Sequence, residues 1–107
     1  MPHLRIRNLE FKTVLGSSTR LTDRLVEAVG CERDWITIEV EDVKAISDGA
    51  PIRGNPFIEV LWFDRPSAVR VAVAKILSEE LKGTAPACTV VFRILDPDCY
   101  FENGESV

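Results

Sequence analysis

The sequence is poor in the residues that most metal and disulfide sites require. It contains a single histidine and three cysteines, and Cys31, Cys88 and Cys99 lie far apart without a C-x-x-C pair. A zinc site draws on several cysteine and histidine ligands, and a disulfide framework needs cysteines that pair. We therefore predict no metal site and three reduced, mostly structural thiols.

Positive charge and long apolar runs are also scarce. The 107 residues carry 13 Lys and Arg against 17 Asp and Glu, so no basic face for nucleic acid is expected. Arg5 and Arg7 interrupt the first apolar segment, which argues against a signal peptide, and no later run is long enough to span a bilayer. We expect a cytoplasmic protein with neither nucleic acid nor membrane as a partner.

What is present predicts one small α/β domain. The composition is 46% hydrophobic and 28% charged, which is ordinary for a soluble chain of a size that supports one core. Apolar residues alternate as in strands over residues 2–8, 35–41, 57–64 and 89–95. They recur at helical spacing over residues 11–29, which Gly30 ends, and from an expected N-cap at Ser67 to Gly83. Residues 44–56 are predicted as a loop, and a short apolar piece at residues 99–101 is expected to add to a sheet edge.

The two halves of the chain repeat the same landmarks at the same interval. The pairs Pro2 and Pro56, Gly30 and Gly83, and Asp42 and Asp96 are separated by 54, 53 and 54 residues. Each half is therefore predicted as a βαβ unit with parallel strands and a right-handed crossover. We predict a single domain over residues 1–107 with a four-stranded mixed sheet and two helices on one face. Its parts are the repeats 2–43 and 56–96, the linker 44–55 and the C-terminal tail 97–107.

The sheet face away from the helices is predicted to be charged. By alternation it carries His3, Arg5, Arg7, Thr37, Glu39, Glu41, Glu59 and Arg93. Such a face is either solvated or covered by partner subunits, in which case its charges must be paired. We favour the second alternative, because a closed oligomer also covers the edges of the sheet.

Several segments together resemble the tautomerase superfamily, at the two-unit length of its macrophage migration inhibitory factor branch. They are the N-terminal Met1-Pro2, the two βαβ units, the short terminal strand, and the runs over residues 29–38 and 88–96. Residues 57–65 also resemble a branch of small, functionally uncharacterised bacterial proteins with this fold. The resemblance implies a tautomerase-like fold and a homotrimer.

The resemblance also implies a reaction. Removal of Met1 would expose Pro2 as a secondary amine, and burial together with nearby cations would lower its pKa. An ordinary α-amino group titrates at about 7.7–8.0, so a modest shift makes it a general base at neutral pH. The implied activity is keto-enol tautomerisation of a small, carboxylate-bearing 2-oxo acid, with no cofactor. If Met1 is retained, Pro2 is an amide and has no such role.

The same resemblance suggests which residues bind the substrate. Arg65 is the leading candidate for the carboxylate, because its family counterpart lies beside the N-terminal proline. Arg33 and Trp35 fall near the family's pocket-lining lysine and aromatic positions, although Cys31 occupies the place of the lysine. Arg93 either contributes from a neighbouring subunit or balances a glutamate on the charged face.

Other interpretations stay open at this point. Pro2 can simply begin an edge strand, and Arg65 can pair with Asp64 in a loop. The chain can also be a non-catalytic oligomeric binding or scaffold protein with the tautomerase fold. A ferredoxin-like small-molecule-binding regulatory module has the same order of elements, but it does not pair its first two strands.

Overall fold

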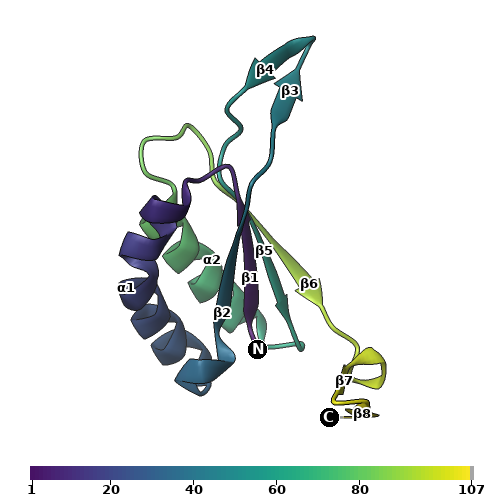
Figure 1. Ribbon diagram of the computed structural model, residues 1–107. Helices are drawn as coiled ribbons and strands as arrows, with labels where there is room; N and C mark the ends of the chain where they lie inside the picture. Colours follow the sequence, from purple (N-terminus) through teal and green to yellow (C-terminus); the bar gives the residue numbers. More distant parts are fainter. Residues whose placement is uncertain (107) are drawn as a thin grey trace.

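The computed structural model describes residues 1–106 and contains a four-stranded sheet with two helices on one face (Figure 1). Its strands, in spatial order, are β2 (Thr37–Glu41), β1 (His3–Arg7), β5 (Phe57–Trp62) and β6 (Thr89–Ile94). The helices are α1 (Phe11–Val29) and α2 (Ser67–Leu81), and the 3-10 turns are η1 (Arg33–Trp35) and η2 (Pro97–Cys99). The predicted α/β fold with two βαβ units is confirmed.

The pairing of the strands separates the two folds that the order of elements left open. Strand β1 is parallel to β2 and antiparallel to β5, and β5 is parallel to β6. The sheet is therefore mixed, as predicted. The direct pairing of β1 with β2 excludes the ferredoxin-like arrangement.

An approximate twofold axis relates the two halves of the chain. Arg5 lies directly opposite Glu59 in the β1–β5 ladder, and these two residues are also 54 apart in sequence. The Thr37 amide donates to the Pro2 carbonyl at 3.3 Å, and in the other half the Thr89 amide donates to the Pro56 carbonyl at 3.0 Å. The repeat inferred from sequence is thus a repeat of backbone structure.

The prediction of a loop over residues 44–56 was wrong, because this segment contains a β-hairpin. Strands β3 (Ala45–Ser47) and β4 (Ala50–Ile52) pair with each other and project from the body at the end opposite the N-terminus (Figure 1). The turn residues Asp48 and Gly49 have φ of 47° and 78°, which an Asp-Gly pair tolerates in a tight hairpin. We call this hairpin the arm.

The C-terminal tail also forms a hairpin of its own. Strands β7 (Phe101–Glu102) and β8 (Glu105–Ser106) pair with each other, so the expected addition to the edge of the main sheet was wrong. The turn at Asn103 and Gly104 has φ of 54° and 78°, nearly the same as the arm turn, 55 residues earlier. Each half of the chain is therefore a βαβ unit followed by a hairpin.

The core lies between the sheet and the two helices. Its side chains with no exposed surface are Leu4, Ile6, Leu21, Leu25, Ile58, Val60, Trp62, Val73 and Leu77. Ile94 is 49% exposed, although the alternation of β6 places it on the same face as Val90 and Phe92, because it ends the edge strand, which the helices cover only in part. Ser67 is the first helical residue rather than the N-cap, because the extended Pro66 takes that position.

Two glycines give a matched test of this structure. Gly16 lies inside α1 with no atom within 4 Å of an added Cβ, so Gly16→Ala should raise the free energy of unfolding by about 0.5–1 kcal/mol. A Cβ on Gly54 would lie 2.5 Å from the Asn8 amide nitrogen, which donates to the Asn55 carbonyl. Gly54→Ala should therefore lower the free energy of unfolding by about 1 kcal/mol. Urea denaturation measures both, and equal stability of the two variants would contradict the close approach.

Candidate functional site

A cavity of about 230 Å³ lies beside the chain's N-terminus. We call it the N-terminal pocket. It is lined by Met1, Trp35, Phe63, Arg65, Tyr100 and Glu102. These residues come from the segment before β1, from η1, from the turn after β5 and from the C-terminal hairpin with its preceding residue. The structure thus brings two of the predicted site residues, Arg65 and Trp35, together with the N-terminus.

Arg65 is held against the N-terminal residue. Its Nη2 lies 3.4 Å from the Met1 carbonyl oxygen, to which it donates, and its guanidinium carbon lies 5.7 Å from the centre of the Trp62 ring. The buried Arg65 Nε has no hydrogen-bond partner among the described residues. Asp64 pairs with Arg70 instead, at 3.4 Å, so the alternative pairing of Arg65 with Asp64 is not found. The guanidinium is therefore positioned at the pocket with donor capacity to spare.

The N-terminus is partly buried, with Met1 half-buried ahead of Pro2. Pro2 is fully buried, and its carbonyl is fixed by the bond from Thr37. Burial lowers the pKa of the Met1 α-amino group below its ordinary value. Arg65 lowers this pKa further, whereas Cys31, Glu102 and Asp34 raise it. An amine in this position is more often neutral at pH 7 than an exposed one, which is what a base requires.

The other wall of the pocket is aromatic and carries a carboxylate. The rings of Phe63 and Tyr100 meet edge to face with centres 5.0 Å apart, and Trp35 is 54% exposed at the rim. The Tyr100 hydroxyl donates to Glu102 Oε1 at 3.0 Å, and this hydrogen bond raises the pKa of Tyr100. Sequence reasoning proposed no role for Phe63, Tyr100 or Glu102. The Asn-Gly pair after Glu102 was the signal that the tail folds back as a hairpin.

The other two predicted substrate-binding residues do not line the N-terminal pocket. Arg33 Nη1 pairs with Asp23 Oδ1 of α1 at 2.6 Å, and neighbouring Cys31 is buried. Arg93 Nε pairs with Glu59 Oε2 at 2.5 Å on the open face of the sheet, and this hydrogen bond lowers the pKa of Glu59. Within one chain, Arg65 is therefore the guanidinium that lines the pocket.

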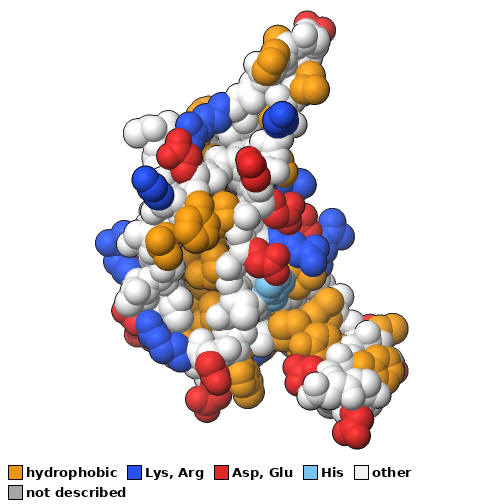
Figure 2. Space-filling view, viewed as in Figure 1, with side chains coloured by type: hydrophobic (Ala, Val, Ile, Leu, Met, Phe, Trp, Pro, Cys, Tyr) orange, Lys and Arg blue, Asp and Glu red, His pale blue; other side chains and the backbone are white. Residues whose placement is uncertain are grey.

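The open face of the sheet carries charges of both signs. Figure 2 shows acidic and basic side chains gathered there around the pale blue histidine. His3 contacts the Thr37 hydroxyl and lies 2.6 Å from Glu39 across the β1–β2 pair, and Arg7 stacks on the Phe57 ring at 4.2 Å. Arg5 lies in register between Glu39 and Glu59. We call this surface, formed by β2, β1, β5 and β6 away from the helices, the open face.

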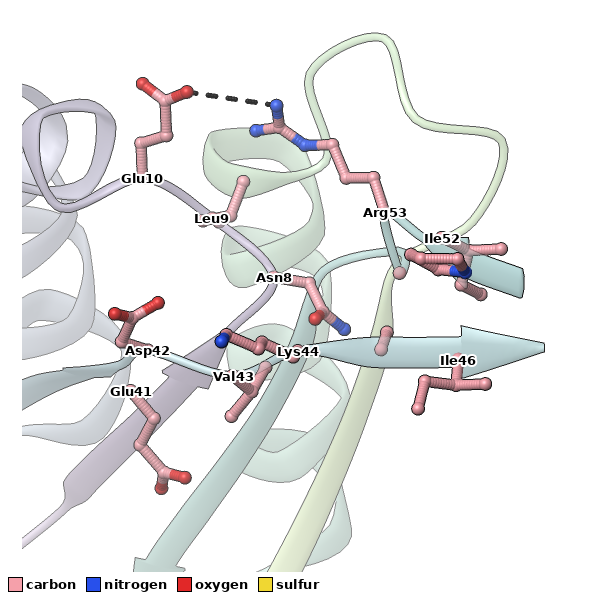
Figure 3. Close-up of a pocket in the computed structure, with 13 residues that line it drawn as sticks. Asn8, Leu9, Glu10, Glu41, Asp42, Val43, Lys44, Ile46, Ile52 and Arg53 are labelled. Carbon is pink, nitrogen blue, oxygen red and sulfur yellow. Dashed lines mark ion pairs between the residues drawn. The ribbon is translucent and has the colours of Figure 1, made fainter. Parts of the chain in front are cut away.

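A larger cavity of about 490 Å³ lies at the base of the arm, at the other end of β1 (Figure 3). Glu10 and Arg53 face each other across it at 3.8 Å. Its lining overlaps in part with the twofold counterpart of the N-terminal pocket, since Leu9 and Ile46 lie 54 residues before Phe63 and Tyr100, while Asn55, which corresponds to Met1, lines a neighbouring cavity. It has no terminal amine, and the counterpart of Arg65 is the exposed Phe11. The duplicated fold therefore carries the amine and the arginine at one end alone.

Neither a metal cluster nor a membrane helix appears in residues 1–106. No group of three or more His, Cys, Asp or Glu side chains there is arranged to hold a metal ion. The helices of this part are too short or too polar to cross a membrane.

Comparison with known proteins identifies the family. Residues 1–106 match the domain of unknown function DUF1904. The chain belongs to the DUF1904 family. A solved DUF1904 domain from Sebaldella termitidis is 37% identical, with 97% of each chain covered and a TM-score of 0.91. No curated protein matches the sequence.

More distant structures relate this DUF1904 chain to the tautomerase superfamily by fold. A fused 4-OT asymmetric trimer matches with a TM-score of 0.79 and 14% identity, covering 98% of this chain and 95% of that one. A macrophage migration inhibitory factor-like protein from Entamoeba histolytica matches with a TM-score of 0.66 and 12% identity, covering 99% and 98%. The tautomerase-like fold expected from the sequence is confirmed.

The charges around the N-terminus predict opposite shifts of the amine pKa in two variants. With Met1 in place, Arg65→Gln removes a positive neighbour and should raise the pKa of the α-amino group, whereas Glu102→Gln should lower it. The pH midpoint of acylation of the N-terminal amine, followed by mass spectrometry, measures both. Glu105→Gln alters the same hairpin outside the pocket and is the control. Shifts of the same sign in both pocket variants would contradict this arrangement.

Proposed function

We propose that this DUF1904 protein is a cofactor-independent keto-enol tautomerase that acts in the cytoplasm on a small 2-oxo acid. Its general base is Pro2, freed by removal of Met1. The observation that carries the proposal is the convergence of the partly buried N-terminus with Arg65 in one small cavity. The description of the DUF1904 family names no activity, and the distantly related structures support the fold alone.

The proposed reaction moves one proton and leaves the substrate's composition unchanged. The neutral Pro2 nitrogen takes a proton from the carbon next to the carbonyl, and the electrons of that bond move to the carbonyl oxygen. Arg65 binds the carboxylate and stabilises the negative charge that develops on the enolate oxygen. The protonated Pro2 then returns the proton to that oxygen, which gives the enol.

Met1 determines whether this reaction is possible. With Met1 present, the Arg65 guanidinium donates to the Met1 carbonyl and Met1 forms part of the pocket wall. Its removal takes away that acceptor and leaves Pro2 as the terminal residue beside Arg65. Both changes favour binding of a substrate carboxylate by Arg65 and proton transfer to Pro2.

The test compares three versions of the N-terminus in an enolisation assay with phenylpyruvate. Protein whose intact mass lacks Met1 should be active, and protein that retains Met1 should be inactive. Insertion of one glycine between Met1 and Pro2 converts Pro2 to an amide and should lower kcat/KM by about 10²-fold or more. Pro56→Ala changes the twofold-related, internal proline and should keep the activity. Equal turnover with and without Met1 would overturn the proposal.

We also propose that the protein assembles as a homotrimer through the open face. One chain leaves this face without a covering layer, and Arg5 lies between two glutamates in a pattern of alternating charge. A ring of identical subunits covers such a face and shields the edge strands β2 and β6. Arg93, which is paired with Glu59 within the chain, is then a residue of the subunit interface.

Light scattering tests the assembly directly. The wild type should have three times the 12.0 kDa mass of the chain. Arg5→Glu places a third carboxylate between Glu39 and Glu59 and should shift the mass to that of one chain. Lys75→Glu makes the same charge reversal on an exposed position of α2 and should leave the trimer intact. A monomeric wild type at micromolar concentration would contradict the proposal.

One observation favours a second candidate, a non-catalytic oligomeric binding or scaffold protein. Arg33 is paired with Asp23, and Cys31 is buried. Residues 31–33 therefore supply no second cation to the pocket, which is lined by the guanidinium of Arg65. Ligand binding by mature protein without turnover of any 2-oxo acid would select this candidate.

A further inference from the structure

The N-terminal pocket is lined by one positively charged and one negatively charged side chain. Arg65 supplies the positive charge, and Glu102 supplies the negative charge from the C-terminal hairpin. We propose that the pocket selects a small monocarboxylic acid whose far end carries an ammonium group, and that it rejects diacids. This inference rests on the proposed function, because it names the substrate class of the same site.

Arg65 is suited to the carboxylate end of the ligand. Its Nη2 donates to the Met1 carbonyl, while its buried Nε lacks a hydrogen-bond partner in the described chain. A guanidinium presents its donors in a planar fork that matches two carboxylate oxygens. A carboxylate bound there replaces the acceptor of Nη2 that is lost with Met1.

Glu102 and the aromatic side chains are suited to a cation. Glu102 accepts a hydrogen bond from the Tyr100 hydroxyl through Oε1. This is the one side-chain hydrogen bond that Glu102 makes within residues 1–106. A carboxylate has about four acceptor positions and no donor, so the group opposite must donate or be positively charged. The rings of Trp35, Phe63 and Tyr100 line the same cavity, and aromatic faces attract an ammonium group.

The same groups disfavour a second carboxylate. A diacid whose first carboxylate is bound by Arg65 directs its second toward Glu102 and the aromatic faces, where negative charge is repelled. At about 4 Å, two like charges in water already repel by roughly 1 kcal/mol, which corresponds to about fivefold in affinity. The preferred substrate is then a 2-oxo acid with a distal amine. Transamination of a diamino acid is the class of reaction that supplies such a compound.

Three unreactive acids of equal chain length test the inference. Hexanoate, 6-aminohexanoate and adipate differ only in a neutral, positive or negative far end, and titration calorimetry measures their Kd with protein whose mass lacks Met1. The corresponding four-carbon acids, butanoate, 4-aminobutanoate and succinate, test a shorter spacing. At one of the two chain lengths, the wild type should bind the acid with the terminal amine at least about fivefold more tightly than the diacid.

Variants assign the preference to Glu102. Glu102→Gln should remove most of the preference, and Glu102→Lys should reverse it in favour of the diacid. Glu105→Lys makes the same charge change on β8 outside the pocket and should keep the wild-type order. Equal binding of amino acid and diacid by the wild type at both lengths, or an unchanged order in Glu102→Lys, would overturn the inference.

These measurements distinguish a failure of the inference from a failure of the proposed function. The probes cannot enolise, so the order of their affinities does not depend on turnover. If the mature protein enolises phenylpyruvate but its probe affinities do not follow the predicted order, Pro2 remains the base and the substrate class is rejected. If the affinities follow the predicted order but the protein does not enolise phenylpyruvate, the ligand class is kept and the tautomerase activity is rejected.

Discussion

The antiparallel pairing of β1 with β5 is the contact on which the rest of the structure depends. It joins the two βαβ units into one sheet and places the start of β1 beside the end of β5, since His3 lies opposite Leu61. The N-terminus therefore lies next to the turn that carries Phe63 and Arg65. A shift by one residue would turn Leu4 and Ile6 away from the helices, so core packing also fixes the geometry of the pocket.

The twofold repeat explains why the N-terminal pocket is distinguished from its counterpart. Pro2 and Pro56 are both buried and both accept a hydrogen bond from the threonine that begins the neighbouring strand. Pro56 lies within the chain, however, so its nitrogen is an amide and never a base. Strand register makes the two ends alike, whereas the free terminus, Arg65 and the aromatic side chains make one of them chemically distinct.

The sequence was sufficient for the main sheet, because buried strands and amphipathic helices have a clear hydrophobic period. It was not sufficient for the arm, whose strands have three residues each and largely exposed side chains. The Asp48-Gly49 pair was the available signal, and its partner Asn103-Gly104 would have extended the repeat to both hairpins. The positions of Arg65 and Trp35 followed from family resemblance. The pairing of Arg33 with Asp23 depends on side-chain geometry between η1 and α1, which no sequence period encodes.

The proposed reaction requires a neutral, nucleophilic N-terminal amine in the pocket at pH 7. An alkynyl 2-oxo acid such as 2-oxo-3-pentynoate measures this directly, because a neutral amine adds to it and a protonated one does not. Peptide mass spectrometry of mature protein after treatment with one equivalent should find the label on Pro2, with Lys12, Lys44, Lys75 and Lys82 unmodified. Label on a cysteine or lysine with Pro2 unmodified would contradict the account.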